Sequence, residues 1–126
     1  MSGCPFCSIQ RDKFIAHDVH TFTVRDTLPV SPGHMLILPK RHVASIFEAS
    51  QEEVVSLWEA LKQSRIQLLK EFSPDGFNIG INDGLASGQT ILHLHIHIIP
   101  RYKGDVPDPR GGIRWIFPDK AVYWKD

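Results

Sequence analysis

Cysteine is scarce in this sequence of 126 residues, which contains only Cys4 and Cys7. The chain also lacks any apolar run of the ~20 residues that a membrane-spanning helix needs. Its first ten residues have neither the charged nor the apolar segment of a secretory signal peptide. We therefore expect a cytoplasmic protein that does not enter membranes. In such a protein the two cysteines are expected to be a metal pair or free thiols rather than a structural disulfide.

An excess of charge of either sign is absent as well, because 14 Lys and Arg balance 14 Asp and Glu. Without a global field that would attract polyanions, we expect no nucleic-acid partner. The sequence has no internal repeat and no Gly-x-x-x-x-Gly-Lys-Ser/Thr motif, which excludes a P-loop protein. The length and the hydrophobic fraction of 42% indicate one compact domain over residues 1–126.

The most distinctive stretch is His-Leu-His-Ile-His-Ile-Ile at residues 93–99. In an extended strand, successive side chains point to opposite faces. We therefore expect the aliphatic side chains of this stretch on the core side and His93, His95 and His97 together on the other face. A polar strand face explains one histidine better than three at a fixed pitch. Metal binding and catalysis by neutral imidazole are the two functional interpretations, and both stay open here.

The remaining chain predicts an α+β fold with strands near residues 14–16, 21–25, 34–39 and 77–81. The strand at 34–39 is almost continuously apolar, so it should lie centrally in the sheet with both faces covered. A capping box, Ser50 with Glu53, predicts the start of one long helix that ends near residue 73. The expected apolar face of this helix, with Trp58 and Phe72 in the core, is Val54, Leu57, Trp58, Leu61, Leu68, Leu69 and Phe72.

The segment after the histidine strand, residues 101–126, is rich in Gly, Pro and Arg. We expect an extended tail that lies over a surface and ends in an aromatic cluster. Its arginines are candidates for binding a polyphosphate and equally for a solvated surface: Arg101, Arg110 and Arg114.

The histidine stretch resembles the signature of the histidine triad (HIT) superfamily, His-φ-His-φ-His-φ-φ with φ apolar. Ser-Pro-Gly-His at residues 31–34, Asn82 and Gly-Gln-Thr at residues 88–90 also resemble family positions in order and spacing. The resemblance extends from Cys4 to about Arg101. It implies a HIT-like antiparallel sheet of about five strands with one long helix, in a two-fold homodimer. The chain is similar to a bacterial-type HIT nucleotide hydrolase with a Cys-x-x-Cys zinc knuckle.

The resemblance also implies a set of catalytic residues. In that family the middle histidine, here His95, attacks the α-phosphate of a nucleotide, and water then hydrolyses the nucleotidyl-histidine. His97 and His34 would surround the phosphate. This chemistry needs neither a catalytic metal nor an organic cofactor, because clustered imidazoles and loop N–H groups can neutralise the phosphoryl charge.

Substrate-binding residues are implied in the same way. Thr90, implied as a catalytic residue with the three histidines, would offer its hydroxyl to the phosphate or the leaving group. Gly88 and Gln89 would bring backbone N–H groups to it. Asn82 would contact the phosphate or the leaving-group side, and Asp26 would hold the ribose hydroxyls. The residues placed to sandwich the base are Phe6, Val24 and Ile9.

A structural zinc site is a further implication of the resemblance. Cys4 and Cys7 have the spacing of a zinc knuckle, and the remaining ligands of zinc-carrying family members correspond to His42 and His93. A closed set of four ligands would have a structural role. It would also leave His95 and His97 as the catalytic histidines of the triad.

The sequence indicates the substrate less clearly than it indicates the site residues. Residues 32–34 and 97–101 resemble the branch that cleaves dinucleoside polyphosphates, whereas Asp26 and Asn82 resemble the branch that cleaves P–N bonds of nucleoside phosphoramidates. Hydrolysis of dinucleoside polyphosphates such as diadenosine tetraphosphate is the expected activity. A purine nucleoside phosphoramidase and a nucleotide-binding regulatory protein with little turnover are the alternatives, and an intact His95 favours an enzyme.

Overall fold

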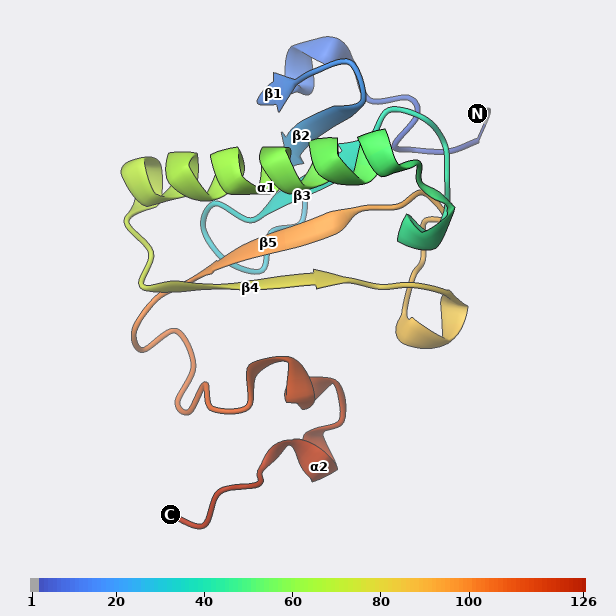
Figure 1. Cartoon of the computed structure of the whole chain (residues 1–126). Helices are drawn as coiled ribbons and strands as arrows, with labels where there is room; N and C mark the ends of the chain where they lie inside the picture. The colour runs from blue at the N-terminus through green and yellow to red at the C-terminus, as the bar shows by residue number, and fades with distance from the viewer. Residues whose placement is uncertain (1–2) are drawn as a thin grey trace.

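Five antiparallel strands form one sheet, and a single long helix packs on it in the computed structural model (Figure 1). The structure describes residues 3–126; Met1 and Ser2, which the predicted domain includes, lie outside the described residues. The sheet order is β1-β2-β3-β5-β4. The α+β class and the five-stranded sheet are as predicted. The strand bounds are β1 Ala16–His17, β2 Thr21–Arg25, β3 Met35–Pro39, β4 Gly76–Ile81 and β5 Ile96–Arg101.

The middle strand, β3, is buried along its whole length, which confirms the prediction from its apolar sequence. It pairs with β2 on one side and with β5 on the other, where Leu36 is opposite His97. The first strand is shorter and later than predicted. The carboxylate of Asp18 accepts hydrogen bonds from the backbone N–H groups of His20 and Thr21, at 2.8 Å each, and so places the turn after His17.

The helix α1 runs from Gln51 to Phe72 and begins as its capping box predicts. The Ser50 hydroxyl accepts from the Glu53 N–H, and the Glu53 carboxylate accepts from the Ser50 N–H. Arg41 donates two hydrogen bonds to the same carboxylate, at 2.7 and 3.1 Å. These bonds from Arg41 hold the pKa of Glu53 at about 2, so the helix start is tied to the strand exit by a charged pair at neutral pH.

The predicted apolar face of α1 is only partly correct. Leu57, Leu61 and Leu68 are buried at helical spacing, and Phe72 packs at the edge of the same core. Trp58 is 62% exposed, so its placement in the core was wrong. The three buried leucines are separated by four and then by seven residues, and Trp58, the residue after Leu57, points about 100° away from Leu57 around the helix. A tryptophan in that position lies outside the stripe despite its size.

The helix covers one face of the sheet, packing against β2, β3 and β5. A second apolar cluster lies on the other face of β2 and β3. Its buried members and the residues packed on it are Phe22, Val24, Leu36, Leu38, Phe6, Ile9 and Phe14. In this arrangement the even-numbered side chains of β3 meet the N-terminal segment, and the odd-numbered ones meet the helix side.

The histidine stretch differs from prediction at its start. The aliphatic side chains alternate into the core as expected, but β5 begins at Ile96 rather than at His93. The N–H of Leu94 donates to the carbonyl of Val43 at 2.7 Å, outside the ladder between β3 and β5. His93 and His95 are buried as well, because the N-terminal segment covers them. Of the three histidines, only His97 is half-buried rather than buried.

The tail after β5 is more structured than the sequence indicated. A 3-10 helix occupies Gly112–Ile116, and a short helix, α2, occupies Pro118–Ala121. Gly111 has φ +93°, and a Cβ there would lie 3.2 Å from the Ala121 carbonyl oxygen, so the turn requires glycine. Figure 1 shows this tail beyond β4, on the side of β4 away from β5. Within residues 3–126, none of the helices has the length and apolarity needed to span a bilayer.

Candidate active site and metal centre

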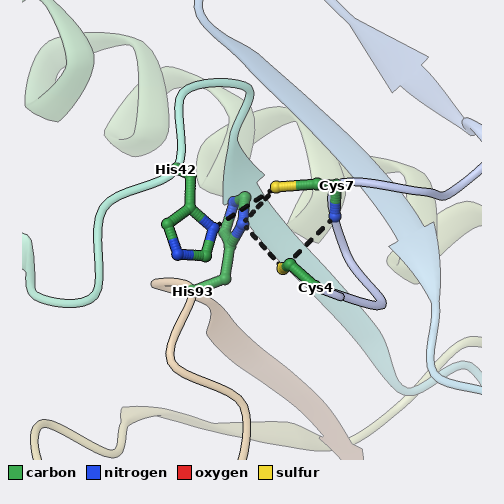
Figure 2. Close-up of side chains that lie close together, drawn as sticks. All are labelled: Cys4, Cys7, His42 and His93. Carbon is green, nitrogen blue, oxygen red and sulfur yellow. Dashed lines mark hydrogen bonds between the residues drawn. The ribbon is translucent and has the colours of Figure 1, made fainter. Parts of the chain in front are cut away.

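The two cysteines and two of the histidines form one cluster. Cys4 and Cys7 come from the N-terminal segment, His42 from the exit of β3, and His93 from the approach to β5. Their side chains converge on one point, as Figure 2 shows, and the four ligand atoms all lie within 4.8 Å of one another. The four residues named from the resemblance are therefore brought together at metal-binding distance.

Hydrogen bonding sets the tautomer of His93 in a way that suits a metal. Its Nε2 lies 2.8 Å from the Pro39 carbonyl oxygen, which can only accept, so Nε2 carries the proton. The lone pair is then on Nδ1, which lies 3.5 Å from the sulfur of Cys4 and 3.5 Å from that of Cys7. Burial lowers the pKa of His93 and keeps the ring neutral, as a metal ligand must be.

Cys7 and His42 complete the set of four possible metal ligands. Nδ1 of His42 lies 3.3 Å from the sulfur of Cys7. Burial raises the pKa of the Cys7 thiol, and a bound cation would oppose that rise by favouring the thiolate. Two sulfurs and two imidazole nitrogens are the donors of a tetrahedral Cys2His2 site, so the residues present fit zinc.

The nucleophile predicted from the resemblance, His95, is joined to this cluster by two contacts. Its Nδ1 donates to the carbonyl oxygen of His93 at 2.8 Å, which leaves the lone pair of the neutral ring on Nε2. The ring of Phe6, which lies between the two cysteines in sequence, meets the His95 ring edge-on with centroids 4.9 Å apart. The metal cluster and the N-terminal segment thus fix both the tautomer and the position of His95.

His97 and His34 form a second cluster with Asp26. Nδ1 of His34 accepts from the N–H of Val30 at 3.2 Å, so the neutral His34 ring carries its proton on Nε2. That proton is donated to Nδ1 of His97 at 2.9 Å, and the carboxylate of Asp26 lies 3.5 Å from the same Nε2. His97 in turn keeps its own proton on Nε2. The ring centroids of His97 and His95 are 5.1 Å apart, so the two clusters adjoin.

The ligand atoms of this second cluster lie close enough together to bind a metal ion, but the proton positions on its histidines do not suit one. The ligand atoms of Asp26, His34 and His97 lie within 4.8 Å of one another. A cation there would need a lone pair on Nε2 of His34, where the hydrogen bond from Val30 requires a proton instead. Burial lowers the pKa of both histidines, while the charge of Asp26 raises it. The cluster is therefore organised to hold two neutral imidazoles.

Hydrogen bonds between its own residues hold the loop that joins β4 to the histidine stretch. The N–H of Gly88 donates to Leu85, and the N–H of Gln89 donates to Gly84, at 3.0 and 3.2 Å. The Gln89 side chain is buried and bridges Gly84 N–H and the Ala44 carbonyl. In this conformation the two N–H groups expected to bind phosphate are used within the loop. Their contact with a ligand stays a prediction that requires the loop to open.

Thr90 and Asn82, two other predicted site residues, line different hollows of the surface. Thr90 is exposed and lines a hollow beside Cys4 and His42, not the one that contains His97. Asn82 is exposed and lines the cavity in front of His34 and His97. The three residues expected at the base, Phe6, Val24 and Ile9, belong to one apolar cluster next to His95.

The cavity in front of His34 and His97 has a volume of about 990 Å³. Its sheet side includes Asn82, Gly88 and Ile99, and its far wall is made by three apolar residues of the tail. Sequence reasoning missed that wall, although it noted an aromatic tail. The only signal was the Gly-Gly pair at 111–112: both glycines have positive φ, and a Cβ at Gly112 would lie 3.4 Å from Asn78 Nδ2 on β4. The tail side chains that line the cavity are Ile113, Ile116 and Phe117.

Comparison with known proteins agrees with this geometry. The HIT domain profile matches residues 9–104. The chain belongs to the HIT family. A solved relative, described as a hypothetical histidine triad nucleotide-binding protein from Sulfolobus tokodaii, superposes with a TM-score of 0.76 at 36% identity, covering 83% of this chain and 73% of the other. The tail from residue 105 onward lies outside the matched family segment.

Relatives within the HIT family carry several activities. A HIT-like protein of Methanocaldococcus jannaschii is 36% identical over 106 residues, covering 81% of each chain. A bis(5'-adenosyl)-triphosphatase of Dictyostelium discoideum is 40% identical over 85 residues, covering 68% of this chain and 57% of that one. An adenylylsulfatase, HINT3, of Arabidopsis thaliana is 36% identical over 108 residues, covering 82% and 55%. The family includes nucleotide hydrolases that differ in the group they release.

Proposed function

We propose that this HIT protein is a nucleotide hydrolase that acts at an α-phosphate through a nucleotidyl-histidine intermediate on His95. The observation that carries the proposal is the hydrogen bond from His95 Nδ1 to the His93 carbonyl. It places the lone pair of a neutral imidazole on Nε2, beside a second neutral imidazole, His97. A lone pair of this kind is what a histidine nucleophile requires.

In the proposed reaction, Nε2 of His95 forms a bond to the α-phosphorus, and the bond to the leaving group breaks with its electron pair. Nε2–H of His97 donates a hydrogen bond that stabilises the negative charge that develops there. His34 fixes His97 through its Nε2–H, and Asp26 fixes His34. Water then attacks the phosphorus and releases the nucleoside monophosphate.

Zinc, in this proposal, supplies structural cross-linking when bound to Cys4, Cys7, His42 and His93. The four-ligand set is closed, so the metal has no open position for substrate. We also propose that two chains pair as a homodimer. Support for the pairing comes from exposed apolar side chains on α1 and β4, considered in the Discussion.

The candidate substrates differ in the group that would leave the phosphorus. The sequence favours dinucleoside polyphosphates, and the Dictyostelium relative bears such an activity in its name. The candidate polyphosphate ligands, however, are all engaged. Arg101 is bonded to Asp105 and Asn78, Arg110 to Asp108 and Asp126, and Arg114 to two carbonyls of the tail. This observation favours the second candidate, hydrolysis of nucleoside phosphoramidates, which release an uncharged amine.

The nucleophile is tested by rapid quench of the wild-type protein with labelled diadenosine polyphosphate and, separately, adenosine 5′-phosphoramidate at equal concentration. Mass analysis should place a nucleotidyl adduct on His95. His95→Ala should lose nearly all turnover yet still bind adenosine monophosphate, and His97→Ala should lose less. His17→Ala, at an exposed histidine, serves as the control. An adduct on His97, or full turnover in His95→Ala, contradicts the assignment, and tight binding without any adduct indicates a regulatory protein.

A further inference from the structure

The two cysteines lie close enough to react with each other. Cys4 and Cys7 are free thiols on one N-terminal turn, and their sulfurs are among four ligand atoms that all lie within 4.8 Å of one another (Figure 2). A disulfide needs an S–S distance of about 2 Å. Because both sulfurs belong to a short segment outside the sheet and the long helix, closing that gap rearranges the segment rather than either element. The pair is therefore a candidate for reversible oxidation as well as for binding metal.

The two sulfurs differ in their access to solvent. Cys4 is 8% exposed, whereas Cys7 is half-buried. The N–H of Cys7 donates to the Cys4 sulfur at 3.4 Å, so the two residues are also in direct contact. A thiol that reacts with an oxidant must be reached by it, and a second thiol beside it then resolves the oxidised sulfur. Exposure assigns the first step to Cys7 and the second to Cys4.

Oxidation of the pair would remove half of the zinc ligands. In a disulfide neither sulfur is a thiolate, and the thiolate is the form that binds a metal. The donors that remain are the Nδ1 atoms of His42 and His93. A structural zinc site uses four donors, and two imidazoles supply only half of them. Zinc held by this cluster would thus be released as the disulfide forms.

The cysteine turn also contacts the proposed nucleophile. Phe6 lies between the cysteines in sequence, and the centroid of its ring is 4.9 Å from that of His95 and 6.0 Å from that of His93. The His93 carbonyl accepts the hydrogen bond that leaves the lone pair of His95 on Nε2. Drawing the sulfurs together moves the segment that carries Phe6, and loss of the metal frees His93. The oxidation state of the cysteines therefore bears on the reactivity of His95.

Resting on the zinc site and the nucleophile of the proposed function, we propose that Cys4 and Cys7 are a peroxide-reactive dithiol whose oxidation releases zinc and lowers turnover. The Cys7 thiolate attacks hydrogen peroxide, an S–O bond forms as the O–O bond breaks, and hydroxide leaves. The Cys4 thiolate then attacks the Cys7 sulfur, an S–S bond forms as the S–O bond breaks, and a second hydroxide leaves. The two sulfurs together lose two electrons, and the peroxide gains them. A dithiol reductant reverses the oxidation, after which zinc can bind again.

The test treats the zinc-loaded full chain with hydrogen peroxide and follows three quantities. Released zinc is measured with a chromogenic chelator, alkylatable thiols by mass analysis, and turnover of adenosine 5′-phosphoramidate by steady-state kinetics. We expect one zinc ion released per chain as both thiols are lost. We also expect kcat to fall on the order of tenfold, because a small displacement of His95 misaligns it with the phosphorus. Dithiothreitol with added zinc should restore all three quantities.

Cys7→His is the matched variant, because it keeps four metal donors and cannot form the disulfide. It should keep its zinc, and whatever turnover it starts with, through the same treatment. The wild-type protein decides the question even if this variant does not fold. The proposal is refuted if zinc stays bound and both thiols remain alkylatable after peroxide, or if turnover is unchanged in the disulfide form. A chain that binds no added zinc contradicts the zinc site instead, and a reduced, zinc-loaded chain without turnover on any nucleotide substrate contradicts the proposed function.

Discussion

Asp26, His34 and His97 show how single hydrogen bonds decide the chemistry of a residue. The ribose contact that the resemblance predicts for Asp26 stays a prediction, and in the structure the Asp26 carboxylate also lies 3.5 Å from Nε2 of His34. From there it raises the pKa of His34 and of His97, opposing the stronger effect of burial. Because Nδ1 of His97 must accept from His34, a proton added to the pair disrupts this arrangement.

We predict that Asp26→Asn moves the acid limb of kcat/KM to lower pH. Burial lowers the pKa of the two histidines and Asp26 raises it, so removing the carboxylate lowers it further. The pair then stays neutral, and the enzyme active, to a more acidic pH. A pH profile of kcat/KM for wild type and variant measures the limb. Asp12→Asn, at an exposed carboxylate, should leave the limb in place, and a shift of the limb to higher pH in Asp26→Asn would contradict the prediction.

The identity of these residues could be predicted from the sequence, and their protonation could not. The spacing of the histidines and the Pro-Gly-His segment selected His34, His95 and His97. The tautomers depend on the carbonyl of His93 and the N–H of Val30, which are backbone groups that any residue supplies. Trp58 illustrates the same limit, since its type favours burial and only the rotation of the helix places it outside.

At the scale of elements, the N-terminal segment with Cys4, Phe6 and Cys7 forms a clamp that holds His95 of the candidate active site. Cys4 and Cys7 flank Phe6, whose ring packs on His95, and His93 holds His95 through its carbonyl. A ligand set that includes Cys4, Cys7 and His93 therefore ties down both contacts to His95. The sequence predicted the ligands but placed His93 inside the strand. Its true position before β5 follows from the bond between Leu94 and Val43, a loop contact without a sequence pattern.

We predict one zinc ion per chain, and a loss of stability in Cys4→Ser of about 2–4 kcal/mol, or roughly 10 °C in Tm. Because the clamp also positions His95, kcat should fall more than KM rises. Metal analysis, thermal unfolding and steady-state kinetics measure the three quantities. Lys13→Ser, an exposed change in the same segment, is the control. A metal-free protein whose Tm is insensitive to a chelator would falsify the zinc assignment.

At the scale of the whole molecule, the long helix and the edge strand both leave apolar side chains uncovered. The exposed apolar side chains of α1 include Val55 at 61% and Trp58 at 62%, and on β4 Ile79 is 47% exposed. β4 is the last strand in the sheet order, so one of its edges is unpaired among residues 3–126. Apolar surface beside an open edge is a common feature of contacts between protein chains.

We predict a homodimer that Trp58→Glu dissociates. Sedimentation at micromolar concentration should give twice 14.3 kDa for wild type and a single chain mass for the variant, because a buried carboxylate without a partner is costly. Gln67→Glu is the matched control, since nine residues along an α-helix place it on the opposite side of α1. A wild-type monomer at that concentration, or a Trp58→Glu dimer, contradicts this model of pairing.

The sheet order also has a consequence for biosynthesis. β5 is the last strand in sequence but lies between β3 and β4, and it pairs with both. A nascent chain therefore cannot complete the centre of its sheet until residue 101 has left the ribosome. Bringing Cys4 to His93 closes a loop of 89 residues, which costs about 4 kcal/mol of chain entropy. Until then β3 and β4 each present an unpaired edge, so the nascent chain is exposed to aggregation until β5 has emerged.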